Sequence, residues 1–209
     1  MNYANIFSIL ERDHKETMLE QFSNYSKFQM LIATMLSART KDTTTIPIVI
    51  NMFKKWKDPE DFVDVSLLKL EKELYGIGFY KVKAKNIKKL SQQIVEEFKG
   101  KVPASLEEMT LLPGVGRKTA NCMLNYAFGK DAIAVDIHVH RISNRLGWIK
   151  TKSPEESEQE LMRILPQELW NKVNMLLVNH GQTICFPIKP NCKECNIKAY
   201  CEYGNQQVN

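Results

Sequence analysis

The sequence lacks long apolar runs, internal repeats and low-complexity segments. No stretch approaches the ~18 consecutive apolar residues of a membrane-spanning helix. The first residues, MNYANIFSILERDHKE, have no basic leader and carry charges too early for a signal peptide. These absences argue against a membrane protein and against a secreted one. We expect an intracellular protein, in which disulfide bonds are rare.

Strand patterns are also scarce. The one run with the composition of a strand, AIAV at residues 132–135, is too short to build a sheet. Elsewhere the apolar residues recur with helical spacing. With 209 residues, 44% of them hydrophobic and 25% charged, the chain can bury one large core or two small ones. The sequence therefore predicts an all-α protein with two helical lobes, divided near residue 130.

Capping residues mark several predicted helix ends. Ser66 is a predicted N-cap, and Ser105 with Glu108 fits a capping box. Pro47 is tolerable near the start of a helix that the threonines at 43–45 would cap. We expect the stripe of Phe28, Leu31, Ile32, Met35 and Leu36 to form the buried face of another helix.

Charge of neither sign dominates. The chain has 29 Lys and Arg against 24 Asp and Glu, a net charge of +5, which is compatible with a polyanionic partner but does not require one. Basic residues concentrate in KVKAKNIKK (81–89), and acidic ones in SPEESEQE (153–160). The basic run fits either a surface that binds a polyanion or a solvated helix face.

Residues 111–129, LLPGVGRKTANCMLNYAFG, contain a lysine in an unusual place. Lys118 follows a Pro-Gly-Val-Gly turn at a predicted helix start, where the macrodipole disfavours a cation. At about 100° per residue, it lies opposite the apolar stripe, with Asn121 and Asn125, so we expect it to point away from the core. The glycines and the free N–H groups that follow them suit a phosphate. An ordinary tight turn with a solvated lysine also fits.

Four of the five cysteines lie in one short segment that contains no histidine, CFPIKPNCKECNIKAYC. They are Cys185, Cys192, Cys195 and Cys201, spaced C-x6-C-x2-C-x5-C. Four thiols this close in an intracellular chain predict a metal centre. The spacing favours an iron–sulfur cluster, because zinc ribbons usually pair two C-x2-C knuckles across a longer gap. Zinc stays the alternative, and the isolated Cys122 is expected to be a packing residue.

Three motifs together resemble the endonuclease III family of DNA glycosylases, which belongs to the helix-hairpin-helix, Gly/Pro-Asp superfamily. They are LPGVGRKTA (112–120), VDIHVHR (135–141) and the cysteine pattern, in this order and separation. The resemblance extends from MLSARTKD (35–42) through GIGFYKVKAKNI (76–87) to HGQTIC (180–185).

The resemblance implies two helical lobes with DNA bound in the cleft between them. Residues 21–131 would form a lobe with the helix-hairpin-helix motif. Residues 1–20 and 132–209 would form the other lobe, with a [4Fe-4S] cluster held by the four cysteines of the C-terminal segment. The N-terminal residues would thus return to pack with the cluster lobe.

The activity implied by the resemblance is a bifunctional DNA glycosylase with apurinic/apyrimidinic lyase activity, which removes oxidised pyrimidines from duplex DNA in base excision repair. Lys118 corresponds to the catalytic lysine of the family. An amine can attack the anomeric carbon, expel the base and form the Schiff base that precedes β-elimination. A helix N-terminus and partial desolvation would lower its pKa from about 10.4 and favour this attack. Asp136 corresponds to the family's aspartate, which would support the cationic sugar and move protons, although by position alone it fits an N-cap.

The resemblance also implies the DNA contacts. Arg39 falls at the wedge position beside the flipped nucleotide, where the family commonly has glutamine, and a phosphate contact fits it as well. Lysines of the 81–85 region would bind the backbone, and Lys189 would make a weaker phosphate contact. The expected DNA-binding residues are Arg39, Lys81, Lys83, Gly114, Gly116, Arg117, His138 and Lys189.

The expected partner is double-stranded DNA with damaged or abasic sites, bound by a monomer in the cytoplasm or nucleoid without a membrane. Lys118 argues against the mismatch-specific relatives, which generally lack this lysine. The alternatives are a monofunctional mismatch glycosylase of the same scaffold, a non-catalytic DNA-binding module and a zinc-stabilised structural protein.

Overall fold

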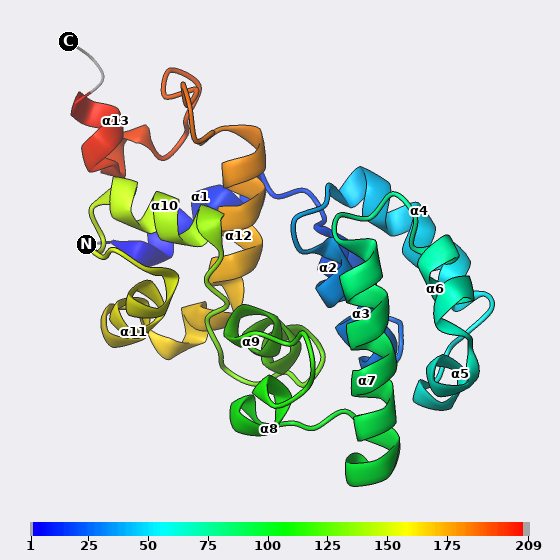
Figure 1. Cartoon of the computed structure of the whole chain (residues 1–209). Coiled ribbons are helices and arrows are strands. Elements are labelled where there is room, and N and C mark those ends of the chain that lie inside the picture. Colours follow the sequence, from blue (N-terminus) through cyan, green and yellow to red (C-terminus); the bar gives the residue numbers. More distant parts are fainter. Residues whose placement is uncertain (1, 207–209) are drawn as a thin grey trace. The chain divides into compact units, whose positions relative to one another are not determined.

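A computed structural model describes residues 2–206 of the chain (Figure 1). Every regular element in this range is a helix, which confirms the predicted all-α class. The chain divides into two compact units, residues 18–129 and residues 1–17 with 130–209; we call them the central unit and the terminal unit. The boundaries expected from the sequence, after residues 20 and 131, fall a few residues away. No helix within residues 2–206 has the length and apolar character needed to cross a membrane.

The central unit is built around one buried helix. Its elements are α2 (Met18–Gln21), α3 (Lys27–Ser37), α4 (Asp42–Phe53), α5 (Pro59–Asp64), α6 (Leu67–Glu73), α7 (Tyr80–Phe98), α8 (Leu106–Thr110) and α9 (Arg117–Tyr126). Helix α3 contacts α2, α4, α7 and α9, and all its residues from Phe28 to Leu36 are buried. The sequence predicted one apolar stripe. The neighbouring helices bury the polar residues of α3 as well, and Thr34 satisfies its hydroxyl by donating to the Met30 carbonyl, 2.7 Å away.

Side-chain caps define several helix starts as predicted, with one correction. Ser66 accepts from the Lys69 amide (3.4 Å), and Ser105 accepts from the Glu108 amide (3.2 Å). Helix α4, however, has Lys41 as its N-cap, so Thr43 to Thr45 lie within its first turn and Pro47 lies inside the helix. The threonines therefore do not cap α4, and the Thr45 hydroxyl donates back to the Lys41 carbonyl (3.1 Å).

Helix α7 carries the basic run, and two of its lysines stabilise the ends of other helices. Lys83 donates to the carbonyls of Leu36 (2.9 Å) and Ala38 (2.6 Å) at the end of α3. Lys88 donates to three carbonyls at the end of α5, those of residues 62, 63 and 65. The last carbonyls of a helix have no partner within it and carry partial negative charge. The run is therefore not simply a solvated face, because two of its ammonium groups hold α3 and α5 against α7.

The terminal unit joins both ends of the chain. Its elements are α1 (Tyr3–Arg12), α10 (Ile137–Leu146), α11 (Pro154–Ile164), the 3-10 turn η1 (Gln167–Leu169), α12 (Trp170–Thr183), the 3-10 turn η2 (Lys198–Tyr200) and α13 (Glu202–Gln206). In Figure 1 the blue α1 lies against the orange α12, and the two are in contact. Phe7 stacks on Trp148 with ring centroids 5.9 Å apart, and Glu11 forms an ion pair with Lys172 of α12.

The strand-like segment 132–135 has no regular secondary structure, although all four of its residues are buried. Side chains of α12 bind two of its backbone groups, since Asn174 donates to the Ala134 carbonyl (2.8 Å) and Asn171 accepts from the Ala132 amide (3.4 Å). The apolar composition thus reflects burial of a connecting segment and not pairing in a sheet.

Replacing Lys88 by methionine should destabilise the fold, because the α5 carbonyls would lose a charged donor. Hydrogen bonds to charged groups contribute about 2 kcal/mol, so we expect thermal unfolding of Lys88→Met to shift down by about 4 to 8 °C for a chain of this size. Lys89→Met, at the exposed neighbouring position, is the control and should change little. Equal melting of the two variants would contradict the capping role.

Candidate functional site

The turn between α8 and α9 is a tight hairpin in the central unit. Gly114 has φ of +82°, and a Cβ there would lie 2.7 Å from Asn86 Nδ2 and 2.9 Å from Met35 Cε. Only glycine fits a backbone pressed this closely against α7 and α3. Gly116 differs, since a Cβ there would meet no atom within 4 Å. The absence of a side chain at Gly116 therefore leaves the start of α9 open to a molecule outside the chain.

Two cations lie in the first turn of α9. Gly116 is the N-cap and makes no side-chain capping bond, and the first turn holds Arg117 and Lys118 but no acidic residue. Each cation opposes the helix dipole by about 0.3–1 kcal/mol. An anion bound at this helix start would be stabilised by the N–H groups and by both side chains.

The face of α9 that Lys118 shares with Asn121 and Asn125 is largely buried. Asn121 and Asn125 are 3% and 9% exposed, and Lys118 itself is half-buried. Other parts of the protein therefore cover the asparagine face of α9 as well as its apolar stripe. Lys118, at the start of that face, lies next to buried polar side chains. The sequence predicted only that Lys118 points away from the core; the burial of the two asparagines that share its face is a result of tertiary packing. The prediction that a helix starts directly after the Pro-Gly-Val-Gly turn, with Lys118 in its first turn, is confirmed.

Two further turns of the central unit meet near the start of α7. Arg39 follows α3, Phe79 is the N-cap of α7, and both have left-handed φ values, +57° and +59°. The Gly78 amide donates to the Thr40 hydroxyl (3.1 Å). The Arg39 guanidinium lies 5.6 Å from the centroid of the Phe79 ring, which is 62% exposed. The molecule thus presents a cation and an aromatic ring together.

Sequence reasoning singled out Arg39 but missed Phe79. An aromatic residue directly after a Gly-Ile-Gly turn was the available signal. Lys81 is exposed, as a phosphate-binding residue should be, whereas Lys83 is half-buried and bonded to carbonyls. Burial lowers the pKa of Lys83 to about 8. Lys83 therefore has a structural role within this unit, and the DNA backbone contact expected of it stays a prediction.

Asp136, in the terminal unit, is the N-cap of α10. Its Oδ1 accepts from the amides of His138 (2.8 Å) and Val139 (2.9 Å). This bears out the capping interpretation, and both bonds go to the same oxygen. A carboxylate held in this way is fixed in orientation, while Oδ2 is not used by the cap.

Helix α10 links Asp136 to the cysteine segment. Arg141 Nη2 lies 3.1 Å from His138 Nδ1 and donates to the Cys185 carbonyl (2.8 Å). His138 packs against Gly181, where a Cβ would lie only 2.4 Å from its Nδ1. The position of His138 is thus set by a glycine of α12 and by an arginine that also binds the first residue of the cysteine segment.

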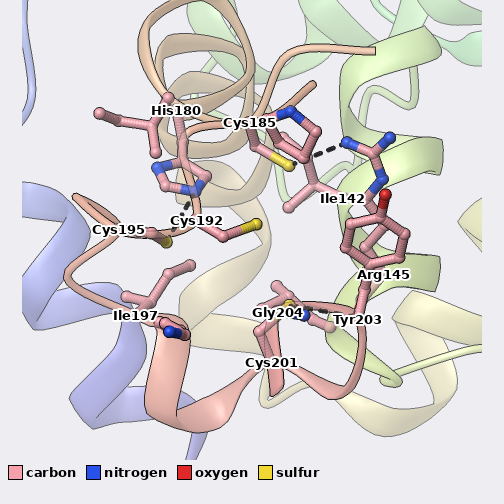
Figure 2. Close-up of a pocket in the computed structure, with 14 residues that line it drawn as sticks. Ile142, Arg145, His180, Cys185, Cys192, Cys195, Ile197, Cys201, Tyr203 and Gly204 are labelled. Atoms are coloured by element: carbon pink, nitrogen blue, oxygen red, sulfur yellow. Dashed lines mark hydrogen bonds between the residues drawn. The ribbon is translucent and has the colours of Figure 1, made fainter. Parts of the chain in front are cut away.

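The four predicted ligand cysteines line one cavity of the terminal unit (Figure 2). All four are free thiols, and Cys185, Cys195 and Cys201 pack against the core of this unit. Burial raises the pKa of the Cys195 thiol to about 11 and, with the neighbouring thiols, raises that of Cys201. Thiolates here would need a positive partner, which a metal centre supplies.

Two residues flank this cavity on opposite sides in Figure 2, His180 and Arg145. His180 Nε2 lies 3.7 Å from Cys195 Sγ, and burial lowers the pKa of His180 to about 4. Arg145 donates to Cys185 Sγ (3.4 Å) and to the carbonyls of residues 186 and 187, and it stacks on Tyr203 at 4.7 Å. The guanidinium thus connects α10 to the start of the cysteine segment and to α13, which follows its end.

The sulfurs accept further backbone bonds, and they surround a space instead of meeting at one point. The Gly204 amide donates to Cys201 Sγ (3.3 Å). Within residues 2–206, no three His, Cys, Asp or Glu side chains gather closely enough to hold a single metal ion. Lys189 lies at the exposed tip of the loop between the first two cysteines, with φ of +51°, beside Ile188, which is 82% exposed.

Comparison with known proteins shows which family this chain resembles. Residues 32–167 match the family model described as HhH-GPD superfamily base excision DNA repair protein. The chain is 44% identical over 192 residues to endonuclease III of Thermotoga maritima, covering 92% of this chain and 86% of the relative. It is 42% identical over 181 residues to endonuclease III of Bacillus subtilis, covering 86% and 83%.

The fold is similar to a solved structure of a trapped endonuclease III–DNA covalent intermediate, with a TM-score of 0.86 and 34% identity over 99% of this chain and 98% of the other. A non-covalent endonuclease III–DNA complex matches with a TM-score of 0.84 and 35% identity over 98% and 97%. The chain therefore belongs to the HhH-GPD superfamily of base excision DNA repair proteins and, within it, to the endonuclease III family.

Proposed function

We infer that this protein is a bifunctional DNA glycosylase with apurinic/apyrimidinic lyase activity that acts in base excision repair. Its membership of the endonuclease III family supports this function. A similar structure is that of an endonuclease III trapped in a covalent intermediate with DNA, and such an intermediate requires a nucleophile on the protein. The observation that carries the assignment is the position of Lys118, in the first turn of α9 directly after the hairpin.

Lys118 is the proposed nucleophile. Its amine forms a bond to the anomeric carbon of the deoxyribose while the bond from that carbon to the base breaks. The bond between that carbon and the ring oxygen then breaks, which gives a protonated Schiff base. A proton is removed from the adjacent carbon, and the 3′ phosphate leaves with the electrons of its bond to the sugar. Only the neutral amine can attack, and a helix start is a place where positive charge is disfavoured in general.

Asp136 is proposed to support the cationic sugar and to move protons. The cap on α10 holds its Oδ1 between the His138 and Val139 amides, which fixes the carboxylate before substrate arrives. A preorganised negative charge stabilises a developing cation more than a mobile one does. Capping and catalysis are thus compatible roles for Asp136.

The substrate we propose is duplex DNA that carries an oxidised pyrimidine or an abasic site. Gly116 and Arg117 would hold a phosphate at the open start of α9, and Lys81, His138 and Lys189 would add contacts to the backbone. Extrusion of a nucleotide leaves a gap in the stack. Arg39 and Phe79 are suited to fill it, since an exposed ring and a guanidinium can both stack on bases.

The cysteine segment is proposed to hold a [4Fe-4S] cluster. The four free thiols that line one cavity, with N–H donors to Cys185 and Cys201, fit such a group, because ligand sulfurs commonly accept hydrogen bonds of this kind. When bound, the cluster would supply the positive charge that stabilises the buried thiolates and would tie the segment to the core. The monomeric state and the location in the cytoplasm or nucleoid stay predictions.

Lys118→Ala should abolish covalent capture while leaving DNA binding nearly intact, because only the nucleophile is lost. Borohydride trapping on a duplex with an abasic site should give an adduct with the wild type, and the mutant yield should fall on the order of 10³-fold or more. Lys81→Ala, which removes an exposed lysine of the same unit, should still trap. A normal adduct with Lys118→Ala would sink the assignment and favour a monofunctional glycosylase or a DNA-binding module.

The two hairpin glycines should respond differently to alanine. Gly114→Ala forces a Cβ into Asn86 and Met35 at positive φ, so it should lower the melting temperature through strain. Gly116→Ala meets open space and should leave the melting temperature unchanged while weakening affinity for duplex DNA. Titration of labelled duplex and thermal unfolding separate the two effects. Unchanged DNA affinity in Gly116→Ala would argue against close approach of the backbone to a phosphate.

Arg145→Met should reduce metal content, because the Cys185 thiol and the two carbonyls beside it lose their shared donor. We expect less iron per protein and weaker broad visible absorbance than in the wild type, with a lower melting temperature. Arg163→Met, which removes an exposed ion pair with Glu160, is the control.

Cys195→Ser should lose iron and become less soluble, and these losses should precede any loss of a specific catalytic step. A wild type that contains zinc and no iron would support the zinc alternative instead.

A further inference from the structure

We propose that Lys83 is a positioning residue for nucleotide extrusion, which acts by holding the turn at residues 38–40 so that Arg39 and Phe79 stay paired. This inference rests on the proposed glycosylase function and deepens it. It concerns the central unit alone, where α3, α7 and both turns lie.

The end of α3 is satisfied partly by its own segment, since the Ser37 hydroxyl donates to the Thr34 carbonyl (2.9 Å) and the Thr40 amide to the Ser37 carbonyl (3.1 Å), and partly by Lys83. Helices commonly end at a glycine in the left-handed conformation, but Ala38 is the C-cap here and Arg39 takes the left-handed φ of +57°. A non-glycine residue in that region costs on the order of 1 kcal/mol. The last turn of α3 contains no basic residue. Lys83 donates from α7 to the two carbonyls that these local bonds do not reach, those of Leu36 and Ala38.

The turn that Lys83 holds is joined directly to the turn that carries Phe79. The Gly78 amide donates to the Thr40 hydroxyl (3.1 Å), and a Cβ at Gly78 would lie 2.9 Å from the Arg39 carbonyl oxygen. Phe79 is itself left-handed at +59°. Two strained residues thus face each other across a tight backbone contact, and Lys83 fixes one side of it.

This arrangement matters for extrusion more than for later chemistry. Side chains that enter a gap in the duplex must be in place when the base leaves the stack, and a misplacement of 1 Å can cost about 10²-fold in rate. Removing a damaged base from an intact pair requires unpairing and unstacking. Cleavage at an existing abasic site has no base to extrude, so it should depend less on the paired turns.

Lys83 differs from a lysine that contacts phosphate. It is half-buried with its ammonium directed at carbonyls, and burial lowers its pKa to about 8, whereas Lys81 on the same helix is exposed. Losing a phosphate contact lowers affinity and the dependence on salt by about one unit of slope. Losing a positioning residue should leave that slope unchanged.

The test compares Lys83→Met with Lys88→Met, which removes the same chemistry from the same helix but at the end of α5. Two single-turnover rates are measured: base excision from a paired duplex with an oxidised pyrimidine, and strand cleavage of the same duplex with a preformed abasic site. We expect Lys83→Met to slow excision about 10-fold or more and cleavage less than about 3-fold. Lys88→Met should lower the melting temperature similarly and leave the ratio of the two rates unchanged.

A double mutant and a second variant complete the test. If Lys83 acts through the Arg39 turn, Lys83→Met combined with Arg39→Ala should excise no more than about 2-fold more slowly than Arg39→Ala alone, since coupled residues are not additive. Thr40→Val breaks the bond to Gly78 and leaves Lys83 in place. It should likewise slow base excision more than cleavage at the abasic site, and it provides the test if Lys83→Met does not fold.

Equal slowing of both reactions by Lys83→Met and Thr40→Val would overturn the inference in favour of a general structural role. A reduced salt slope in Lys83→Met would overturn it in favour of a phosphate contact. Either result, with a wild type active on both substrates, leaves the proposed function standing. A wild type inactive on both substrates would overturn the proposed function and this inference with it.

Discussion

The unpaired backbone groups at helix ends are the constraint on which this structure depends. All regular elements among residues 2–206 are helical, so each element leaves N–H and C=O groups that no sheet can satisfy. Side chains satisfy many of them, as Ser66, Ser105 and Asp136 do at helix starts. Lysines of α7 satisfy others at the ends of α3 and α5. The start of α9 has no side-chain cap, and this is where we propose that a phosphate of DNA binds.

Helix α10 shows how one element can serve both structure and chemistry. Its N-cap is Asp136, and Arg141 and Arg145 lie further along it, about one turn apart. Both arginines bind the cysteine segment, at the carbonyl of Cys185 and at its sulfur. Because the same helix carries the capped carboxylate and these anchors, order in the cysteine segment favours order around Asp136. The cysteine segment is therefore connected through α10 to a proposed catalytic residue of the same unit.

Helix α7 has the corresponding role in the central unit. The turn before it carries Phe79, its first turns carry Lys83 and Asn86, and these contact the Arg39 turn and the Gly114 turn. Three turns that lie far apart in the sequence are therefore organised by one stretch of helix. These three turns, which we propose contact DNA, are thus held by a rigid helix. Little motion of the turns has to be suppressed when DNA binds, which favours precise positioning of their side chains.

Local patterns in the sequence determined the helical class, most of the caps, the hairpin and the cysteine spacing, because each depends on residues within a few positions of one another. The motifs around Lys118 and Asp136 were likewise readable without coordinates. Only the tertiary structure decided that α3 is buried on all sides, that Asn121 and Asn125 are interior, and that Lys83 binds the end of another helix. Periodicity reports which face of a helix is apolar, but it does not report how many neighbours surround that helix. A lysine in a basic run has the same local pattern whether it meets water, a phosphate or a carbonyl some 45 residues away, and only the packing of α3 against α7 distinguishes these cases.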